Sequence, residues 1–378
     1  MILSDQPSHA GSPPLRIEVV EPTLVSEAGH CAALFRGLQA AAPDLPFRLW
    51  IDRAAALPGW NTQRAQLAPH FYRRWRKWQA YWLYRRLLRA PAPVLVPTAT
   101  YLDLRSLDLA APGPLGPGRA YLYFHKLRVS ARRQQALGEL ARRQPHLELF
   151  GTSEEIVARL RAAGFARVHR VLPVLSSAAP ARAAQPFRRL LSAGAARADK
   201  GFTHIVELVE LLERSGSTLP IAVQTSGDHY GRHDEQTTAD LERLRRCRYP
   251  QLELLPDTLD AGQYAALFPG AICLQPYAPA EYADKMSAVT FDALRAGAPV
   301  ITLAGTTMAR IVAQSGAGVV LAQAQPEALL QAASTVVARY PELGARALAA
   351  SQAYAPDTSW APLVEALRSG LHGTANPK

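Results

Sequence analysis

The chain has 378 residues, which is long for one domain and suits two domains of about 180 residues, each able to bury a core. A hydrophobic fraction of 48% and a charged fraction of 19% are typical of a folded globular protein and exclude a disordered one, and no apolar run reaches the roughly 18 residues of a membrane span. The net charge of +11 favours an anionic partner.

The N-terminal residues 1–15 are polar and rich in proline. Because they lack the basic start and the apolar stretch of an export signal, we expect a loose tail. Three cysteines, Cys31, Cys247 and Cys273, lie far apart and show no metal-ligand spacing. We therefore expect a reduced, cytoplasmic protein.

The first half of the chain alternates apolar strands with helical patterns. We predict strands at residues 16–20, 47–52, 93–96, 120–124, 146–150 and 167–173. A loop at 23–30 follows the first strand and leads into a helix at 32–41. Ser153 precedes two acidic residues, so we expect it to cap a further helix.

Much of the positive charge gathers in residues 70–89, together with aromatic residues. On a helix, at about 100° per residue, the aromatic side chains share one face and the cations take the other. The aromatic residues are Phe71, Trp75, Trp78 and Trp82, and the cations are Arg73, Arg76 and Lys77. Two interpretations stay open: a surface for an anionic membrane, or a core helix whose aromatic stripe packs on its own sheet.

A stretch of small residues and prolines at 175–186 is the predicted linker between two halves. Beyond it we predict strands at 189–192, 221–225, 252–255, 272–275, 300–303 and 318–321, alternating with helices. Pro326 suits the first turn of one of these helices, and the final helix is expected at 360–370. Strands alternating with helices predict an α/β fold with parallel sheets.

The segment 190–202 reads as a strand that ends in Gly194 and small residues, followed by Arg197 and Lys200 before a helix at 203–212. Cations in such a loop can neutralise a nucleotide diphosphate, because charge-assisted hydrogen bonds to phosphate are strong. The alternative is a solvated loop with ordinary surface charges.

The segment 271–303 reads as strand, polar loop, helix, glycine turn and strand. Ser287 and Ala288 are small enough for a diphosphate to approach the free N–H groups at the helix start, which also carries the positive end of the helix dipole. Asp292, about one turn into the helix, can accept hydrogen bonds from ribose hydroxyls, whereas Asp284 lies in the loop. Alternatively, these carboxylates are solvated loop and cap residues. We interpret the segment as a nucleotide site.

The same segment resembles the donor-sugar signature of the GT-B glycosyltransferases, in particular the retaining enzymes of glycosyltransferase family 4. The matching residues are Asp284, Asp292, Ala293, Leu294, Gly297, Pro299, Val300 and Ile301. The family has glutamate at both acidic positions, so aspartate shortens each reach by roughly 1.5 Å. Glu281, in the same loop, competes with Asp284 for the first role, and spacing favours Asp284.

The upstream loop also resembles family 4, which has a strand, Gly-Arg, a few residues and Lys-Gly there. Lys200-Gly201 matches, but Ala195 follows Gly194, so the arginine role passes to Arg197. The resemblance further implies that the loop before the first helix faces the cleft, and that a histidine, here His125 at the end of strand 120–124, lies near the transferred sugar. The alternatives are an ordinary helix start and a partly buried histidine that bonds to the backbone.

The resemblance implies an α/β protein of GT-B architecture, with two Rossmann-like domains facing across a cleft. The expected division is a tail at 1–15, an acceptor-binding domain at 16–180, a nucleotide-sugar-binding domain at 187–352, and a C-terminal segment at 353–378 that returns to the first domain. The implied catalytic residues are His125, Arg197, Lys200 and Asp284. The implied donor-binding residues are Gly29, Gly194, Ser287, Ala288, Val289 and Asp292. The expected acceptor or membrane face comprises His30, Arg73, Arg76 and Lys77.

The implied reaction moves a sugar from a nucleotide-diphosphate sugar, the co-substrate, to a hydroxyl of a saccharide or lipid-linked acceptor of the cell envelope, with retention. No Asp-x-Asp triplet occurs, so we expect no metal requirement, and we interpret the polar cluster 228–234 as a solvated loop. The expected location is the cytoplasm, with peripheral contact at an anionic membrane. Alternatives are a GT-B epimerase or phosphorylase, or a nucleic-acid-binding protein, although no nucleic-acid module is present and we expect no such partner.

Overall fold

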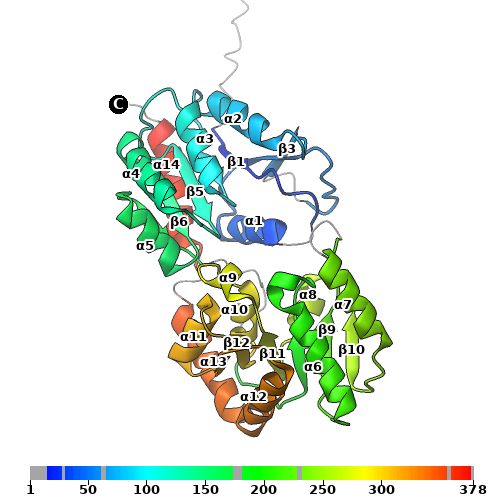
Figure 1. Cartoon of the computed structure of the whole chain (residues 1–378). Helices are drawn as coiled ribbons and strands as arrows, with labels where there is room; N and C mark the ends of the chain where they lie inside the picture. The colour runs from blue at the N-terminus through cyan, green and yellow to red at the C-terminus, as the bar shows by residue number, and fades with distance from the viewer. Residues whose placement is uncertain are drawn as a thin grey trace, which may run out of the picture.

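The structure, a computed structural model, describes residues 15–27, 30–60, 65–172, 181–227, 232–355 and 359–375. These residues form two α/β domains, each built on a twisted parallel sheet with helices on both faces (Figure 1). The sheets have the strand orders β3-β2-β1-β4-β5-β6-β7 and β10-β9-β8-β11-β12-β13. Both orders reverse direction beside the first strand of the domain, which is the doubly wound pattern of α/β proteins.

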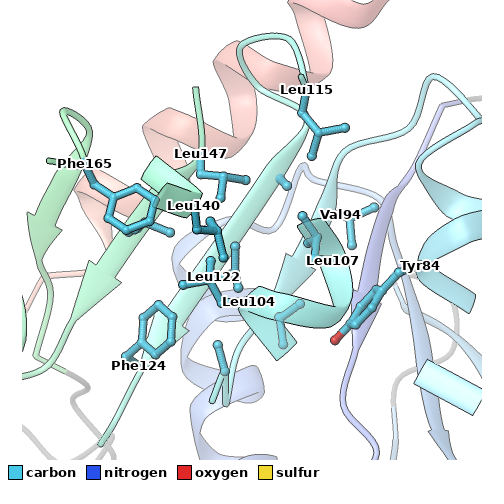
Figure 2. Close-up of a cluster of buried hydrophobic side chains, with 14 of the residues drawn as sticks. Tyr84, Val94, Leu104, Leu107, Leu115, Leu122, Phe124, Leu140, Leu147 and Phe165 are labelled. Carbon is cyan, nitrogen blue, oxygen red and sulfur yellow. The ribbon is translucent and has the colours of Figure 1, made fainter. Parts of the chain in front are cut away.

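In the first domain the strands are β1 (Ile17–Val20), β2 (Phe47–Asp52), β3 (Ala65–Phe71), β4 (Val94–Val96), β5 (Ala120–Phe124), β6 (Glu148–Gly151) and β7 (Val168–Arg170). Its helices are α1 (His30–Ala41), α2 (Arg76–Leu87), α3 (Tyr101–Ala110), α4 (Ala131–Arg143) and α5 (Glu154–Ala162). Every residue of β1, β4, β5 and β6 is buried, because helices cover both faces of the sheet. Figure 2 shows one such layer, with Leu104 and Leu140 of α3 and α4 gathered over Leu122 of β5.

The second domain contains β8 (Arg189–Ser192), β9 (Ile221–Gln224), β10 (Leu252–Leu255), β11 (Ala271–Gln275), β12 (Val300–Leu303) and β13 (Gly318–Leu321). Its helices are the 3₁₀ turn η1 (Ala198–Lys200), α6 (Phe202–Arg214), α7 (Glu235–Arg246), α8 (Ala261–Ala265), α9 (Pro279–Tyr282), α10 (Ala288–Arg295), α11 (Thr307–Ser315), α12 (Pro326–Ala338) and α13 (Tyr340–Tyr354). None of the helices within the described ranges combines the length and the apolar character needed to cross a bilayer.

One strand was missed by the sequence analysis. Residues 70–89 were expected to form one helix, but β3 (Ala65–Phe71) pairs in parallel with β2 and the helix begins only at Arg76. The strand contains Pro69 and His70 and lies at the edge of the sheet, where the hydrophobic pattern is weak and proline is tolerated. Phe71 is therefore a fully buried strand residue, and the expectation that it belongs to a helical face was wrong.

The aromatic stripe of α2 faces solvent. Trp75, Trp78 and Trp82 are 55%, 69% and 62% exposed, whereas α2 packs on the domain through smaller residues and one tyrosine. These packed residues are Ala80, Leu83, Tyr84 and Leu87. The interpretation in which the aromatic stripe packs on its own sheet is thus wrong for all three tryptophans.

The last helix, α14 (Ala361–Ala375), packs on the first domain (Figure 1). Trp360, Leu363 and Leu367 share a buried cluster with side chains of β1 and α1, and the Tyr121 hydroxyl of β5 donates to the Ala366 carbonyl at 2.8 Å. The chain therefore crosses from the first domain to the second and back.

The domains meet through loops at the carboxyl ends of their sheets. Lys126, just after β5, donates to Glu281 of α9 at 2.9 Å. Ser153, at the start of α5, donates to the carbonyl of Asp284 at 3.0 Å. A further ion pair joins Arg310 to Glu155. Ligands of parallel α/β sheets bind at the carboxyl ends of the strands, so both candidate binding edges lie at this junction.

Candidate functional site

Lys200 is the centre of a group of cations at the carboxyl end of the second sheet. The 3₁₀ turn that carries it ends at Gly201, whose φ of 69° favours glycine, and a Cβ there would overlap the Pro276 carbonyl. The Lys200 side chain reaches Gly194, where a Cβ would lie only 2.5 Å from the Lys200 Nζ. Glycine at both positions thus lets the ammonium lie against the backbone that follows β8.

The first turn of α10 lies against the same glycine. A Cβ on Gly194 would be 3.7 Å from Val289 Cγ2, and Ser287, the N-cap, makes no side-chain hydrogen bond to the helix. The amides at the start of α10 therefore have no side-chain cap and carry the positive end of the helix dipole. The structure brings together Gly194, Lys200 and the 287–289 segment, which the sequence assigned to one donor site.

Two further cations lie near Lys200. Burial, with Arg197 and Lys285 as neighbouring positive charges, lowers the pKa of Lys200 to about 8. Burial and Arg197 likewise lower the pKa of Lys285. Asp199 is the carboxylate that binds Arg197, through a 2.8 Å hydrogen bond from Nε. Arg197 thus pairs with Asp199, while Lys200 and Lys285 lie near its positive charge, and such a group of cations suits an anion with more than one negative charge.

Lys285 was not assigned a role from the sequence, although it lies two residues before Ser287. Its ammonium lies 4.6 Å from the ring centroid of Tyr282 and adds to the cations that face the helix start. The hydroxyl of Tyr277, buried beside Ser287, makes no hydrogen bond of good geometry within the described part of the chain. A cation immediately before an uncapped helix start was the available signal for Lys285.

Asp292 lies one turn into α10 and is almost completely buried. Its carboxylate accepts a 3.3 Å hydrogen bond from the Tyr264 hydroxyl of α8. Burial raises the pKa of Asp292 to about 7, partly offset by that hydrogen bond and by the charge of Arg295. The carboxyl therefore gains or loses its proton near neutral pH, and an additional hydrogen-bond donor would favour the charged form.

Asp284 and Glu281 both pair with cations of the first domain. The Asp284 carboxylate lies 3.4 Å from Arg159 and 3.7 Å from Arg128. Glu281 accepts hydrogen bonds from Lys126 and Arg128, each at 2.9 Å, and these bonds lower its pKa to about 2. Both candidates for the first acidic position therefore lie at the domain junction and take part in holding the two domains together.

In the first domain, His125 closes β5 immediately before Lys126. Its Nε2 lies 3.1 Å from the Pro97 carbonyl, and its ring packs on Tyr123. His30 begins α1, and Gly29 lies outside the described residues. Arg73 is exposed in the turn before α2.

The remaining acceptor-face residues, Arg76 and Lys77, line a pocket in the first domain. They are thus separate from the cation group around Lys200. In the polar cluster 228–234, residues 228–231 lie outside the described residues, and Asp234 caps α7 by accepting from Thr237 N at 2.8 Å. Across the described ranges, no three His, Cys, Asp or Glu side chains gather in a way that could hold a metal ion.

No protein-family model and no curated protein matches this chain. Solved structures do match it. A sucrose-phosphate synthase from Thermosynechococcus elongatus has a TM-score of 0.68 at 14% identity, covering 94% of this chain and 97% of that one. WaaG, a glycosyltransferase involved in lipopolysaccharide biosynthesis, has a TM-score of 0.61 at 14% identity over 93% and 98%. HepE of Anabaena, solved with UDP and glucose, has a TM-score of 0.61 at 13% identity over 95% and 99%.

These structures share the GT-B architecture, and their match extends over nearly the whole of this chain. The chain therefore has the GT-B fold, and the predicted fold class is confirmed.

Proposed function

We propose that this protein is a glycosyltransferase that uses a nucleotide-diphosphate sugar. The observation that carries the proposal is the approach of the Lys200 ammonium and the uncapped start of α10 to one glycine, Gly194. Partly buried cations beside free backbone amides are suited to a diphosphate, because the amides supply directed hydrogen bonds and the cations supply charge.

In the proposed reaction an acceptor hydroxyl attacks the anomeric carbon as the bond from that carbon to the diphosphate breaks. The hydroxyl proton passes to the departing diphosphate oxygen, and the new glycosidic bond forms on the face that the diphosphate leaves. Lys200, Arg197 and Lys285 would stabilise the charge that develops on the diphosphate, which is usually the largest catalytic contribution. The retention of configuration in this scheme follows the resemblance to family 4.

We further propose that the reaction needs no metal ion. In metal-dependent transfers a divalent cation neutralises the departing diphosphate. Here three side-chain cations, Arg197, Lys200 and Lys285, lie close enough to influence one another and would supply that charge. Asp292 would accept hydrogen bonds from the ribose, and its location in the helix that binds the diphosphate supports this role.

For the acceptor, we propose a saccharide or lipid-linked molecule of the cell envelope. WaaG, one of the matching structures, is involved in lipopolysaccharide biosynthesis, which supports this class. The exposed tryptophans of α2 support contact with an anionic membrane, because tryptophan favours the bilayer interface. Arg73 and Lys77 beside them would add attraction to anionic lipids.

A panel of nucleotide-diphosphate sugars, screened by thermal shift, tests the donor. A donor at 100 times its dissociation constant should stabilise the protein by about 2.7 kcal/mol. We expect one donor to do so, and expect Asp292→Ala to weaken its effect, while Asp257→Ala, a change in an exposed loop of the same domain, leaves the effect intact. If no member of the panel stabilises the wild-type protein, the proposed function is wrong.

A further inference from the structure

A pocket of about 520 Å³ opens in the first domain, apart from the cation group around Lys200. Thr23, Thr98 and Lys126 place it at the carboxyl ends of β1, β4 and β5. Side chains of α2, α3 and α4 form its outer wall. It therefore occupies, in the first domain, the edge of the sheet at which α/β proteins bind their ligands.

The pocket is strongly cationic. Five of its lining residues carry positive charge, namely Arg76, Lys77, Lys126, Arg128 and Arg133. Its one lining carboxylate, that of Asp103, accepts hydrogen bonds from its own helix cap and a 3.1 Å hydrogen bond from the Tyr84 hydroxyl.

Glu281 of the second domain binds two of the five cations, Lys126 and Arg128. Within the part of the chain that the structure describes, Arg76, Lys77 and Arg133 form no ion pair. Arg133 instead lies over the ring of Tyr101, 5.3 Å from its centroid. Three cations without an acidic partner, aimed at one cavity, suit a phosphate group, which arginine binds through paired hydrogen bonds.

The pocket borders the proposed donor site. Lys126 lines the pocket and pairs with Glu281 at 2.9 Å, and its charge also acts on Lys285 of the donor-site cation group. A ligand in the pocket would thus lie on the first-domain side of the junction, toward the proposed donor site. The remaining lining mixes threonine hydroxyls with apolar groups such as Leu102, which suits a sugar or a short lipid segment attached to the phosphate.

We infer that this pocket binds a phosphate group of the acceptor, an inference that rests on the proposed glycosyltransferase function. The phosphate is held by Arg76, Lys77 and Arg133, and the acceptor hydroxyl extends toward the domain junction at Lys126. The phosphate belongs either to a free sugar phosphate or to a lipid headgroup that carries a phosphomonoester, since both present the same phosphate group to the arginines.

Two double variants test this inference. Arg76→Ala with Arg133→Ala removes one pocket arginine from α2 and one from α4. Arg85→Ala with Arg132→Ala removes one arginine from each of the same helices outside the pocket, so the net charge is matched. The probes are glucose 6-phosphate against glucose, and vesicles of phosphatidylcholine with and without phosphatidic acid.

We expect the wild-type protein to prefer one phosphate-bearing probe over its neutral counterpart. In the variant with Arg76→Ala and Arg133→Ala, the affinity for the phosphate-bearing probe should fall by at least about tenfold. In the control variant that affinity should stay within about twofold of the wild-type value. A preference for the sugar phosphate assigns a free acceptor, and a preference for the phosphatidic acid vesicles alone assigns a lipid headgroup. Equal losses in both double variants, or no preference in the wild type, would overturn the inference.

Donor binding, measured by thermal shift in the same proteins, separates this inference from the proposed function. We expect both double variants to bind the donor as the wild type does, because neither change touches the second domain. An absence of donor binding in the wild type would overturn the proposed function, whereas equal probe binding by the two variants overturns the pocket assignment alone.

Discussion

The two domains present their positive charges in different ways. In the second domain, the Lys200 side chain is half-buried and brings its ammonium against Gly194, beside a helix start and next to the close backbone approach at Gly201. In the first domain, Lys77 and Arg133 are exposed side chains that line a pocket, and α2 also carries exposed tryptophans. A cation held against the backbone is preorganised for one ligand shape, whereas exposed cations can adjust. This difference suits a second domain that binds the same diphosphate in every reaction and a first domain that binds an acceptor from the membrane surface.

The largest expected effect comes from removing the charge of Lys200. Lys200→Met keeps most of the length of the side chain and removes its charge, so the diphosphate loses a cationic donor in a half-buried site. We expect the rate of sugar transfer to fall by about 10²- to 10³-fold, measured as release of the nucleotide diphosphate. Arg214→Met, in the last turn of the following helix, is the control and should retain the wild-type rate. A similar rate for Lys200→Met and wild type would remove Lys200 from the reaction.

The next largest effect is a loss of stability when the glycine after Lys200 is replaced. Gly201→Ala forces a side chain into the left-handed region and against the Pro276 carbonyl, so we expect the free energy of unfolding to fall by about 3 kcal/mol. Gly113→Ala is the matched change, because a Cβ at Gly113 would meet no atom within 4 Å. For the control, urea denaturation should show a loss of less than about 0.5 kcal/mol in the free energy of unfolding. Equal losses in the two variants would contradict the view that the backbone fixes the cation.

The sequence predicted the elements that bury continuous apolar runs. The strands at 120–124 and 300–303 match β5 and β12, every residue of which is buried, because parallel strands covered on both faces are largely apolar. The strand at 189–192 matches β8, in which Leu190 and Leu191 are the buried residues. The edge strand β3 was missed because Pro69 and His70 interrupt its pattern. The edge strands β10 and β13 were predicted at their observed bounds although none of their residues is buried, so the interrupted pattern of β3, rather than its position at the edge, explains the miss.

For the candidate site, the proximity of Lys200 and Ser287 could be predicted because both follow neighbouring strands, β8 and β11, at the same sheet edge. The pairing of Asp284 and Glu281 with Arg128 could not be predicted. That pairing depends on how two domains pack, and the spacing of residues along one chain carries no information about the packing.

The third prediction concerns the first domain and the contact of its α2 tryptophans with a membrane. Trp78→Ser with Trp82→Ser removes two exposed aromatic groups without changing the charge. We expect binding to vesicles that contain anionic lipid to weaken by about tenfold or more, measured by co-sedimentation, because the interfacial aromatic contact is lost. Leu254→Ser with Val320→Ser removes two exposed apolar groups of the second domain and should leave vesicle binding unchanged. Equal binding by both double variants would argue against membrane contact through α2.

The smallest effect is the pH dependence of donor affinity, in which Asp292 and Lys200 of the second domain act in opposite directions. Asp292, with a pKa of about 7, is protonated at lower pH, and a ribose hydroxyl donates more strongly to the charged carboxylate. Affinity should therefore rise with pH through about 7. Lys200, with a pKa of about 8, loses its charge at higher pH, so affinity should fall as the pH rises through about 8.

The expected profile of donor affinity is a narrow maximum between these two pKa values, with a decline of up to about tenfold per pH unit on either side. A nucleotide-diphosphate sugar is the right probe for titration calorimetry, since its doubly esterified diphosphate does not titrate in this range. Asp292→Asn should flatten only the acid limb, and Lys200→Met only the alkaline limb. If both limbs persist in both variants, the titrating groups lie elsewhere. If each variant removes its own limb, the acid limb is assigned to the contact between Asp292 and the ribose. The alkaline limb is then assigned to the contact between Lys200 and the diphosphate.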